Sequence, residues 1–178
     1  PFACHETELT TDAAATKKRV AVIGGGMAGM SAACVAAERG HDAVLFEARQ
    51  ELGGQFDMAR VIPGKEEFDE TLRYFRVRLD DAGVEIRLGT RVDIATLQAE
   101  RFDEVILATG VTPRQLKMPG IERPEVLSYP DVLRDGAEVG ESVAIIGAGG
   151  IGFDVGEYLL HNPEHSLPLA KEHWTAAN

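Results

Sequence analysis

The sequence contains few residues of the kinds that mark several protein classes. It has only two cysteines, Cys4 and Cys34, which form no close pair and no metal-binding spacing. A disulfide framework is therefore not expected, and dithiol–disulfide exchange has no reactive pair. No apolar run approaches the ~20 residues of a bilayer-spanning helix. The first residues show no basic-then-apolar signal pattern and are typical of a segment taken from a longer chain.

Basic residues are also scarce. The 178 residues include 18 Lys and Arg against 29 Asp and Glu, which gives a net charge of −11. Such a chain is a poor partner for nucleic acid or an anionic membrane. At 44% hydrophobic and 26% charged residues it has a globular composition, so we expect a soluble, reduced, cytoplasmic protein.

Strand-like and helix-like segments alternate along the chain. Buried strands are predicted at 20–23, 43–46, 104–108 and 142–146, further strands at 84–88 and 91–92, and helices at 27–40, 65–82, 94–99 and 150–160. The helix at 65–82 carries one apolar stripe formed by Phe68, Leu72, Phe75 and Leu79. This alternation predicts an α/β fold with a Rossmann-like parallel sheet.

The opening unit is repeated. The sequence VAVIGGGMAG at 20–29 matches VAIIGAGGIG at 143–152, so the chain contains two nucleotide-type units. The second unit has only its first strand and helix. A βαβ unit needs roughly 30 residues and a partner strand, so we expect the second Rossmann unit to be truncated.

The first glycine motif joins a predicted buried strand to a predicted helix. In this G-x-G-x-x-G pattern Gly24 permits a tight turn, Gly26 lets a pyrophosphate approach the backbone, and Gly29 lets the helix lie close to the strand. The helix start offers its N–H groups and the positive end of its dipole to phosphates. This context makes the motif a candidate dinucleotide site.

Glu47 ends the next predicted strand, 23 residues after Gly24 and close to the expected interval of about 20. A carboxylate there would accept hydrogen bonds from the ribose hydroxyls and would repel a 2′-phosphate. The first site should therefore take FAD or NAD and disfavour NADP.

Three further segments are candidate cofactor contacts. Gly53-Gly54-Gln55 is either a surface turn or a second approach of the backbone to the same dinucleotide, with Gln55 adding an amide donor. Ala108-Thr109-Gly110 closes a strand and leaves its carboxyl end open to a ligand. The second glycine motif consists of Gly147, Gly149 and Gly152, but its ribose-reading acid is not visible, which leaves NADH and NADPH both open. No general acid or base, catalytic triad or metal cluster is present, so we predict no catalytic residue and no metal ligand. The redox chemistry would belong to a cofactor.

Several longer runs resemble the bacterial NADPH-dependent 2,4-dienoyl-CoA reductases, relatives of the trimethylamine and histamine dehydrogenases. These runs are the first glycine motif, GGQF at 53–56, IPGKEEF at 62–68, TLRY at 71–74 and AIIGAGGIGFD at 144–154. The resemblance extends from residue 3 to about residue 160. It departs mildly at Met27, where relatives usually have proline.

The resemblance implies a domain plan. Residues 1–18 would be a linker after an upstream iron–sulfur segment, 19–112 the first part of an FAD-binding domain, 113–140 a connecting segment, and 141–178 the incomplete start of an NAD(P)H-binding domain. FMN, a 4Fe–4S cluster and the substrate site would lie upstream, outside this chain. Hydride would pass from NADPH to FAD, and electrons would continue through the cluster to FMN and the dienoyl-CoA.

The resemblance also assigns FAD contacts to Ala28, Glu47, Gln55, Lys65 and Val92. An alternative is a module that binds only ADP as a structural element in an amine dehydrogenase relative. The adenosine and pyrophosphate are common to both ligands, so the glycine motif and Glu47 do not separate the two interpretations. The partners expected in either case are dinucleotides and the rest of the parent polypeptide.

Overall fold

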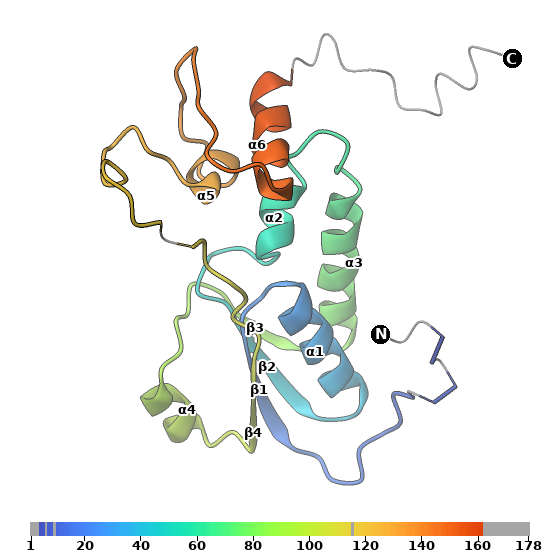
Figure 1. The fold of residues 1–178 in the computed structure, drawn as a ribbon. Coiled ribbons are helices and arrows are strands. Elements are labelled where there is room, and N and C mark those ends of the chain that lie inside the picture. Colours follow the sequence, from blue (N-terminus) through green and yellow to red (C-terminus); the bar gives the residue numbers. More distant parts are fainter. Residues whose placement is uncertain (1–3, 6, 9, 115, 162–178) are drawn as a thin grey trace, which may run out of the picture.

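The computed structural model describes residues 4–161 except Glu6, Leu9 and Gln115 (Figure 1). The predictions for residues 162–178, and for the first three residues of the proposed linker, lie outside this range.

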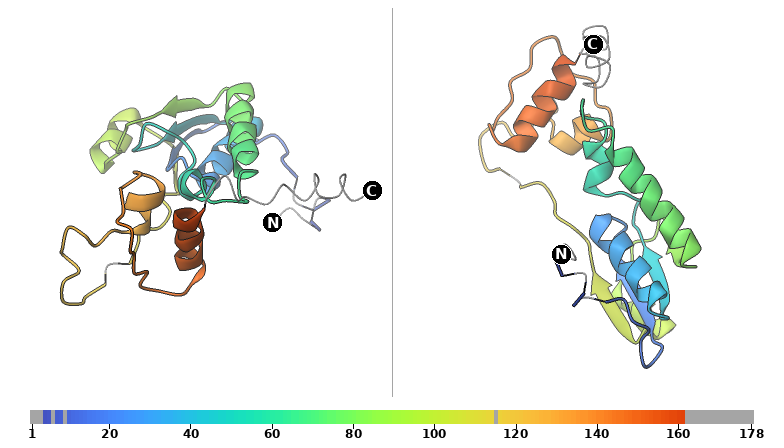
Figure 2. Two further views of the ribbon diagram at one scale, coloured as in Figure 1. Left: turned by 90° about the horizontal axis from the view of Figure 1, so that it is seen from above. Right: turned by 90° about the vertical axis from the view of Figure 1, so that its right-hand side faces the viewer.

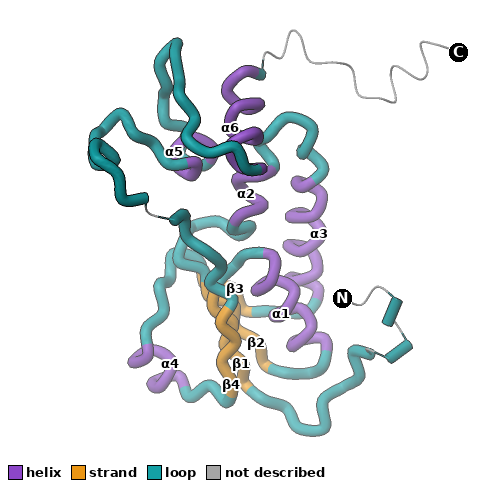
Figure 3. The backbone as a smooth tube through the Cα atoms, in the orientation of Figure 1, coloured by secondary structure: helices purple, strands orange, loops and turns teal. Residues whose placement is uncertain are grey.

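Four parallel strands form one sheet. They are β1 (Arg19–Ile23), β2 (Asp42–Phe46), β3 (Glu85–Arg87) and β4 (Glu104–Leu107), in the order β3-β2-β1-β4 (Figure 3). Ile23 pairs with both Phe46 and Leu107, so β1, β2 and β4 end level with one another. The predicted parallel α/β sheet is confirmed, and the residues that follow these three strands lie at one edge.

Helices α1 (Met27–Glu38) and α3 (Phe68–Asp81) cover one face of this sheet (Figure 2). The predicted stripe of α3 contributes Leu72 and Leu79 to the core, where they join Met30 and the completely buried Cys34. The opposite face is covered more thinly, by α4 (Ile94–Glu100) and its flanking loops, over Phe46.

A second, smaller core lies beyond the carboxyl ends of the strands, above the sheet in Figure 1. It unites α2 (Gln55–Ala59), α5 (Tyr129–Leu133) and α6 (Gly150–Leu160). Its buried residues are Met58, Ile62, Leu133 and Val155. This core brings the helix of the second glycine motif against the unit that carries the first.

Helices α2 and α5 were not predicted from the sequence. Each has five residues, too few for a hydrophobic period to show. Helix α5 did have a signal, because Pro130 lies in its first turn and Asp131 accepts hydrogen bonds from the Ser128 backbone N–H and hydroxyl, both at 2.6 Å. The predicted connecting segment at 113–140 therefore contains a short helix.

Two predicted strands are absent from the part of the chain that the structure describes. Residues 142–146 form no strand and pair with no described strand, and Ile146 is 67% exposed. Their pattern is that of a buried strand, but a strand needs a neighbour to accept its hydrogen bonds. Residues 91–92 form a loop instead, because Val92 packs on the face of the sheet beside Phe46.

The prediction that 104–108 is a buried strand was wrong in its burial. Strand β4 forms, but it is an edge strand in the described structure, and Leu107 is 74% exposed.

No described helix is long and apolar enough to span a membrane.

Candidate functional site

The first glycine turn leads from β1 into α1 and is held by its neighbours. Gly24 has a φ of +112°, and its N–H donates to the Phe46 carbonyl at 2.8 Å. A Cβ on Gly24 would lie 2.3 Å from the Ala108 carbonyl oxygen, and one on Gly29 would lie 1.7 Å from the Gly24 oxygen. Neither position therefore accepts a side chain, as the sequence analysis expected of the motif.

The start of α1 is open to a ligand. Gly26 occupies the N-cap position and no side chain caps the helix, which leaves the first-turn N–H groups without side-chain partners. A Cβ on Gly26 would meet only the Gly54 Cα, at 3.9 Å. Ala28 lies in this first turn, so the backbone around Gly26 and Ala28 can approach a phosphate closely.

Glu47 reaches the glycine turn directly from the end of β2. Its Oε2 accepts a hydrogen bond from the Gly25 N–H at 2.7 Å, and its Oε1 accepts one from the Arg49 N–H at 2.8 Å. A carboxylate has about four lone-pair sites, so two N–H donors leave capacity for ribose hydroxyls. Glu47, expected at the site from its spacing to Gly24, therefore contacts the glycine turn directly in the structure.

The second glycine pair packs against the first turn. Gly53 forms a parallel bridge with Gly26, and its N–H donates to the Gly25 carbonyl at 2.9 Å. Gly54 has a φ of +57°, and a Cβ there would lie 3.0 Å from the Gly26 Cα. Of the two interpretations of this segment, the observed packing favours a second backbone approach at the same place.

The residues that follow β4 differ in how closely they approach the first glycine turn. Ala108 and Thr109 line Gly24, since their backbone atoms limit the space at its Cα. Gly110, with a φ of +73°, has open space around it. The Gln55 amide donates to the Val111 carbonyl and accepts from the Tyr129 hydroxyl, both at 3.5 Å.

Two predicted contacts lie away from the first turn. The Lys65 ammonium forms an ion pair with Asp154 of α6, with 2.7 Å between Nζ and Oδ1. Val92 packs on the sheet face opposite α1, beside Phe46. Of the predicted set for the first site, the structure therefore brings together Gly24, Gly26, Ala28, Gly29, Glu47, Gly54, Ala108 and Thr109 around one turn, with Gln55 beginning the adjacent helix.

Asp57 was not singled out from the sequence. It is the one charged side chain in the core among the described residues, and it pairs with Arg49 at 3.2 Å and Arg60 at 3.1 Å. The hydrogen bond to Asp57 is the main reason why the pKa of Arg60 is raised. This network ties Arg60 and Arg49 to α2 through Asp57. The i,i+3 spacing of Asp57 and Arg60 was the available signal.

The second glycine turn has the same local shape as the first. Gly147 has a φ of +122°, and a Cβ on Gly152 would lie 2.3 Å from the Gly147 oxygen. Gly149 is the N-cap residue of α6 and has no side-chain cap. Gly147 has no neighbour within 4 Å of its ideal Cβ position, because no described strand lies beside it.

Of the two described cysteines, Cys34 is buried and Cys4 is exposed. Burial raises the pKa of the Cys34 thiol, which lies completely buried in the core. No group of three His, Cys, Asp or Glu residues suited to a metal occurs within the described ranges.

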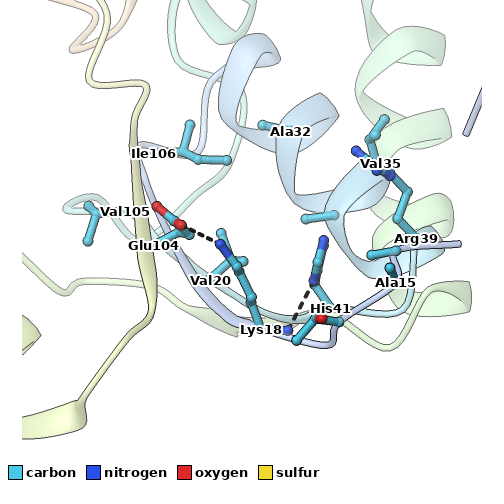
Figure 4. Close-up of a pocket in the computed structure, with 13 residues that line it drawn as sticks. Ala15, Lys18, Val20, Ala32, Val35, Arg39, His41, Glu104, Val105 and Ile106 are labelled. Atoms are coloured by element: carbon cyan, nitrogen blue, oxygen red, sulfur yellow. Dashed lines mark hydrogen bonds and ion pairs between the residues drawn. The ribbon is translucent and has the colours of Figure 1, made fainter. Parts of the chain in front are cut away.

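A hollow of about 630 Å³ lies elsewhere on the molecule (Figure 4). It is bounded by residues 14–16, α1 and the starts of β1 and β4, with the Lys18–Glu104 ion pair at 2.6 Å on its rim. Ligands of parallel sheets bind at the carboxyl ends of the strands, so this hollow is separate from the glycine turns.

Comparisons with known proteins agree with this geometry. The family model described as "Pyridine nucleotide-disulphide oxidoreductase" matches residues 18–166. The chain is 40% identical to an NADH oxidase of Thermoanaerobacter brockii over 82% of this chain and 23% of the oxidase. It is 42% identical to an N,N-dimethylglycine/sarcosine dehydrogenase of Chromohalobacter salexigens over 72% of this chain and 20% of that protein.

Among solved structures, the chain resembles a 2-naphthoyl-CoA reductase bound to 2-naphthoyl-CoA, with a TM-score of 0.86 and 32% identity. That match covers 89% of this chain and 24% of the reductase. The chain thus spans less than a quarter of the length of each of these three proteins.

Proposed function

Since this chain belongs to the pyridine nucleotide-disulphide oxidoreductase family of FAD- and NAD(P)H-binding flavoproteins, we propose that its first glycine turn holds FAD and its second holds NAD(P)H. The chain would be an electron relay, and substrate chemistry would take place elsewhere in the polypeptide. A cytoplasmic location belongs to the same proposal.

The contact between Glu47 and Gly25 carries the assignment of the first site. It places a carboxylate 2.7 Å from the glycine backbone, where it can accept from ribose hydroxyls and repel a 2′-phosphate. The residues fit FAD for a second reason, because Gly26 carries no side chain at the start of α1 and no side chain caps the first-turn N–H groups.

Each residue has a binding task in this proposal. The first-turn N–H groups of α1 orient the pyrophosphate, Glu47 holds the ribose, and Gln55 offers its amide beside the strand ends. FAD, when bound, supplies the capacity to accept a hydride and pass electrons on. No general acid or base is required of this segment, and sequence analysis identified none.

We further propose that the parent enzyme is a 2,4-dienoyl-CoA reductase, with FMN and a 4Fe–4S cluster in its other domains. The sequence runs at 62–74 and 144–154 support this choice. The similarity to a reductase of another CoA thioester agrees with it. The domain boundaries at residues 18, 112 and 140 belong to this proposal, as does the contact of Lys65 and Val92 with FAD.

Anaerobic titration of the full-length protein with NADPH, and in parallel with NADH, tests the relay. We expect the visible absorbance of the oxidised flavins to disappear with about two to three equivalents of reduced nucleotide per FAD, because FAD and FMN each take two electrons, the cluster takes one, and each hydride carries two. A flavin spectrum that stays unchanged with both nucleotides would reject the proposal.

A structural ADP module of an amine dehydrogenase relative is the second candidate. The similarity to an N,N-dimethylglycine/sarcosine dehydrogenase favours it, since that protein is 42% identical over the matched residues. Amine-driven flavin reduction without any response to NADPH would support this candidate over the first.

A further inference from the structure

The ion pair between Lys65 and Asp154 is a direct polar contact between the two glycine units. Lys65 lies in the turn before α3, and Asp154 lies on α6 two residues after Gly152 of the second motif. The side chains are 35% and 28% exposed, so the pair is partly shielded from water. The resemblance assigned Lys65 to FAD, and no role was predicted for Asp154.

The turn that carries Lys65 is fixed by its own hydrogen bonds. The Lys65 N–H donates to the Ile62 carbonyl at 3.0 Å, and the Gly64 N–H donates to the Glu66 carboxylate at 2.9 Å. Gly64 has a φ of +79°, which suits glycine at this position. Lys65 is therefore presented to α6 from a defined backbone.

Apolar packing surrounds the pair on one side. Ile62 and Val155, which lie close in sequence to Lys65 and Asp154, belong to the small core shared by α2, α5 and α6. Apolar contact is non-directional and tolerates rotation or sliding of a helix. A charge-assisted hydrogen bond is directional, so it can select one register of α6 on that apolar surface.

We propose that Asp154 is a positioning residue, which with Lys65 sets the register of the second glycine turn on the first unit. This inference rests on the proposed function. A hydride that leaves NAD(P)H, giving NAD(P)⁺, must reach the flavin and reduce it by two electrons. The separation between the two sites controls that step, and α6 carries the backbone that would bind the nicotinamide dinucleotide.

The test uses the full-length protein and four variants: Lys65→Asp, Asp154→Lys, the double exchange of both, and the near-isosteric Asp154→Asn. Arg73→Ala is the matched control, because Arg73 forms an ion pair with Glu70 on the exposed surface of α3, away from α6. Rapid mixing with NADPH gives the rate of flavin reduction, and the bound FAD is quantified separately.

We expect Asp154→Asn and Asp154→Lys to keep FAD while slowing flavin reduction about tenfold, since small misplacement of reacting groups has large kinetic effects. The double exchange enters only the stability comparison below, because Lys65 is also a proposed FAD contact. Arg73→Ala should leave the rate of flavin reduction unchanged. A rate in Asp154→Asn within about twofold of the natural protein would overturn the proposal.

A second readout needs no nucleotide. Unfolding free energies of the same variants form a double-mutant cycle, and the two positions should be coupled. If the losses of unfolding free energy in the two single variants simply add up in the double variant, the proposal is overturned, even in a protein that takes up no flavin. Failure of the proposed function would instead appear as an absence of FAD in the natural protein, which leaves this cycle interpretable.

Discussion

The two glycine turns of this chain have nearly the same local geometry in very different surroundings. Gly24 and Gly147 have φ of +112° and +122°, and the N-cap glycines of α1 and α6 are both extended. The backbone of Ala108 closes on Gly24, but nothing lies within 4 Å of the corresponding position at Gly147. The turn is therefore a local property of the motif, whereas the walls of a binding site come from distant strands.

The difference extends to the segments that precede each turn. Val22 of β1 is completely buried between two paired strands, and its counterpart Ile145 is 44% exposed. Both segments have the same apolar composition. Burial thus depends on a neighbouring strand and not on the residues alone.

The largest effect is expected at the glycines that allow each helix to approach its turn. Gly29→Ala places a Cβ 1.7 Å from the Gly24 oxygen inside a fixed core, and should lower the free energy of unfolding by about 3 kcal/mol. Gly152→Ala should cost about 1 kcal/mol, because the open second turn can shift. Urea unfolding measures both. Equal losses would contradict the account of an open second turn.

Shortening the side chains of Val22 and Ile145 tests the same difference between the two segments. Val22→Ala removes buried methyl groups from a packed core and should cost about 2 kcal/mol, whereas Ile145→Ala should cost below about 1 kcal/mol. The denaturant midpoints of the two variants measure both losses of stability. A cost at Ile145 as large as at Val22 would mean that the second strand is paired in the protein.

Loss of the Glu47 charge should affect ligand binding more than folding. Glu47→Gln keeps one oxygen acceptor for the Gly25 N–H but weakens the bonds to ribose, so the Kd for FAD should rise about tenfold. Fluorescence titration with FAD measures this. Glu51→Gln, at an exposed neighbouring carboxylate, is the control and should leave the Kd unchanged. An unaltered Kd in Glu47→Gln would remove Glu47 from the site.

The smallest effect concerns the helix that joins the two regions. The hydrogen bond from the Ser128 hydroxyl holds the pKa of Asp131 below its usual value. A lowered native-state pKa stabilises α5 above about pH 4, and this contribution, below about 1 kcal/mol, is lost as the pH falls further. Amide exchange of residues 129–133 across this range should show weaker protection in acid. Asp131→Asn should abolish that pH dependence, and its persistence would contradict the assignment.

The sequence predicted the elements whose signals are local. The run from Gly24 to Glu47 has its strand, turn, helix and acid at fixed spacings, and the stripe of α3 repeats at a helical period, so both were found. Helices α2 and α5 are too short for a hydrophobic period, and the only local signal of α5 is the helix start marked by Ser128 and Asp131.

The remainder depends on contacts between distant residues. Whether residues 142–146 form a strand depends on a partner, which no local pattern supplies. The partner of Lys65 lies 89 residues away in the sequence, and no local pattern points to it. Lys65, which the resemblance assigned to FAD, is paired with Asp154 in the structure. For the candidate site, the glycine turn and Glu47 could thus be predicted, but the cross-unit contact could not.

The central claim is that the first glycine turn is a preformed FAD site. The most direct test is to purify the full-length protein, denature it, and identify the released nucleotides by chromatography and mass. The account predicts FAD in the natural protein, and its loss in Glu47→Ala. Release of ADP without FAD would contradict it and would make this segment a structural adenine-nucleotide holder.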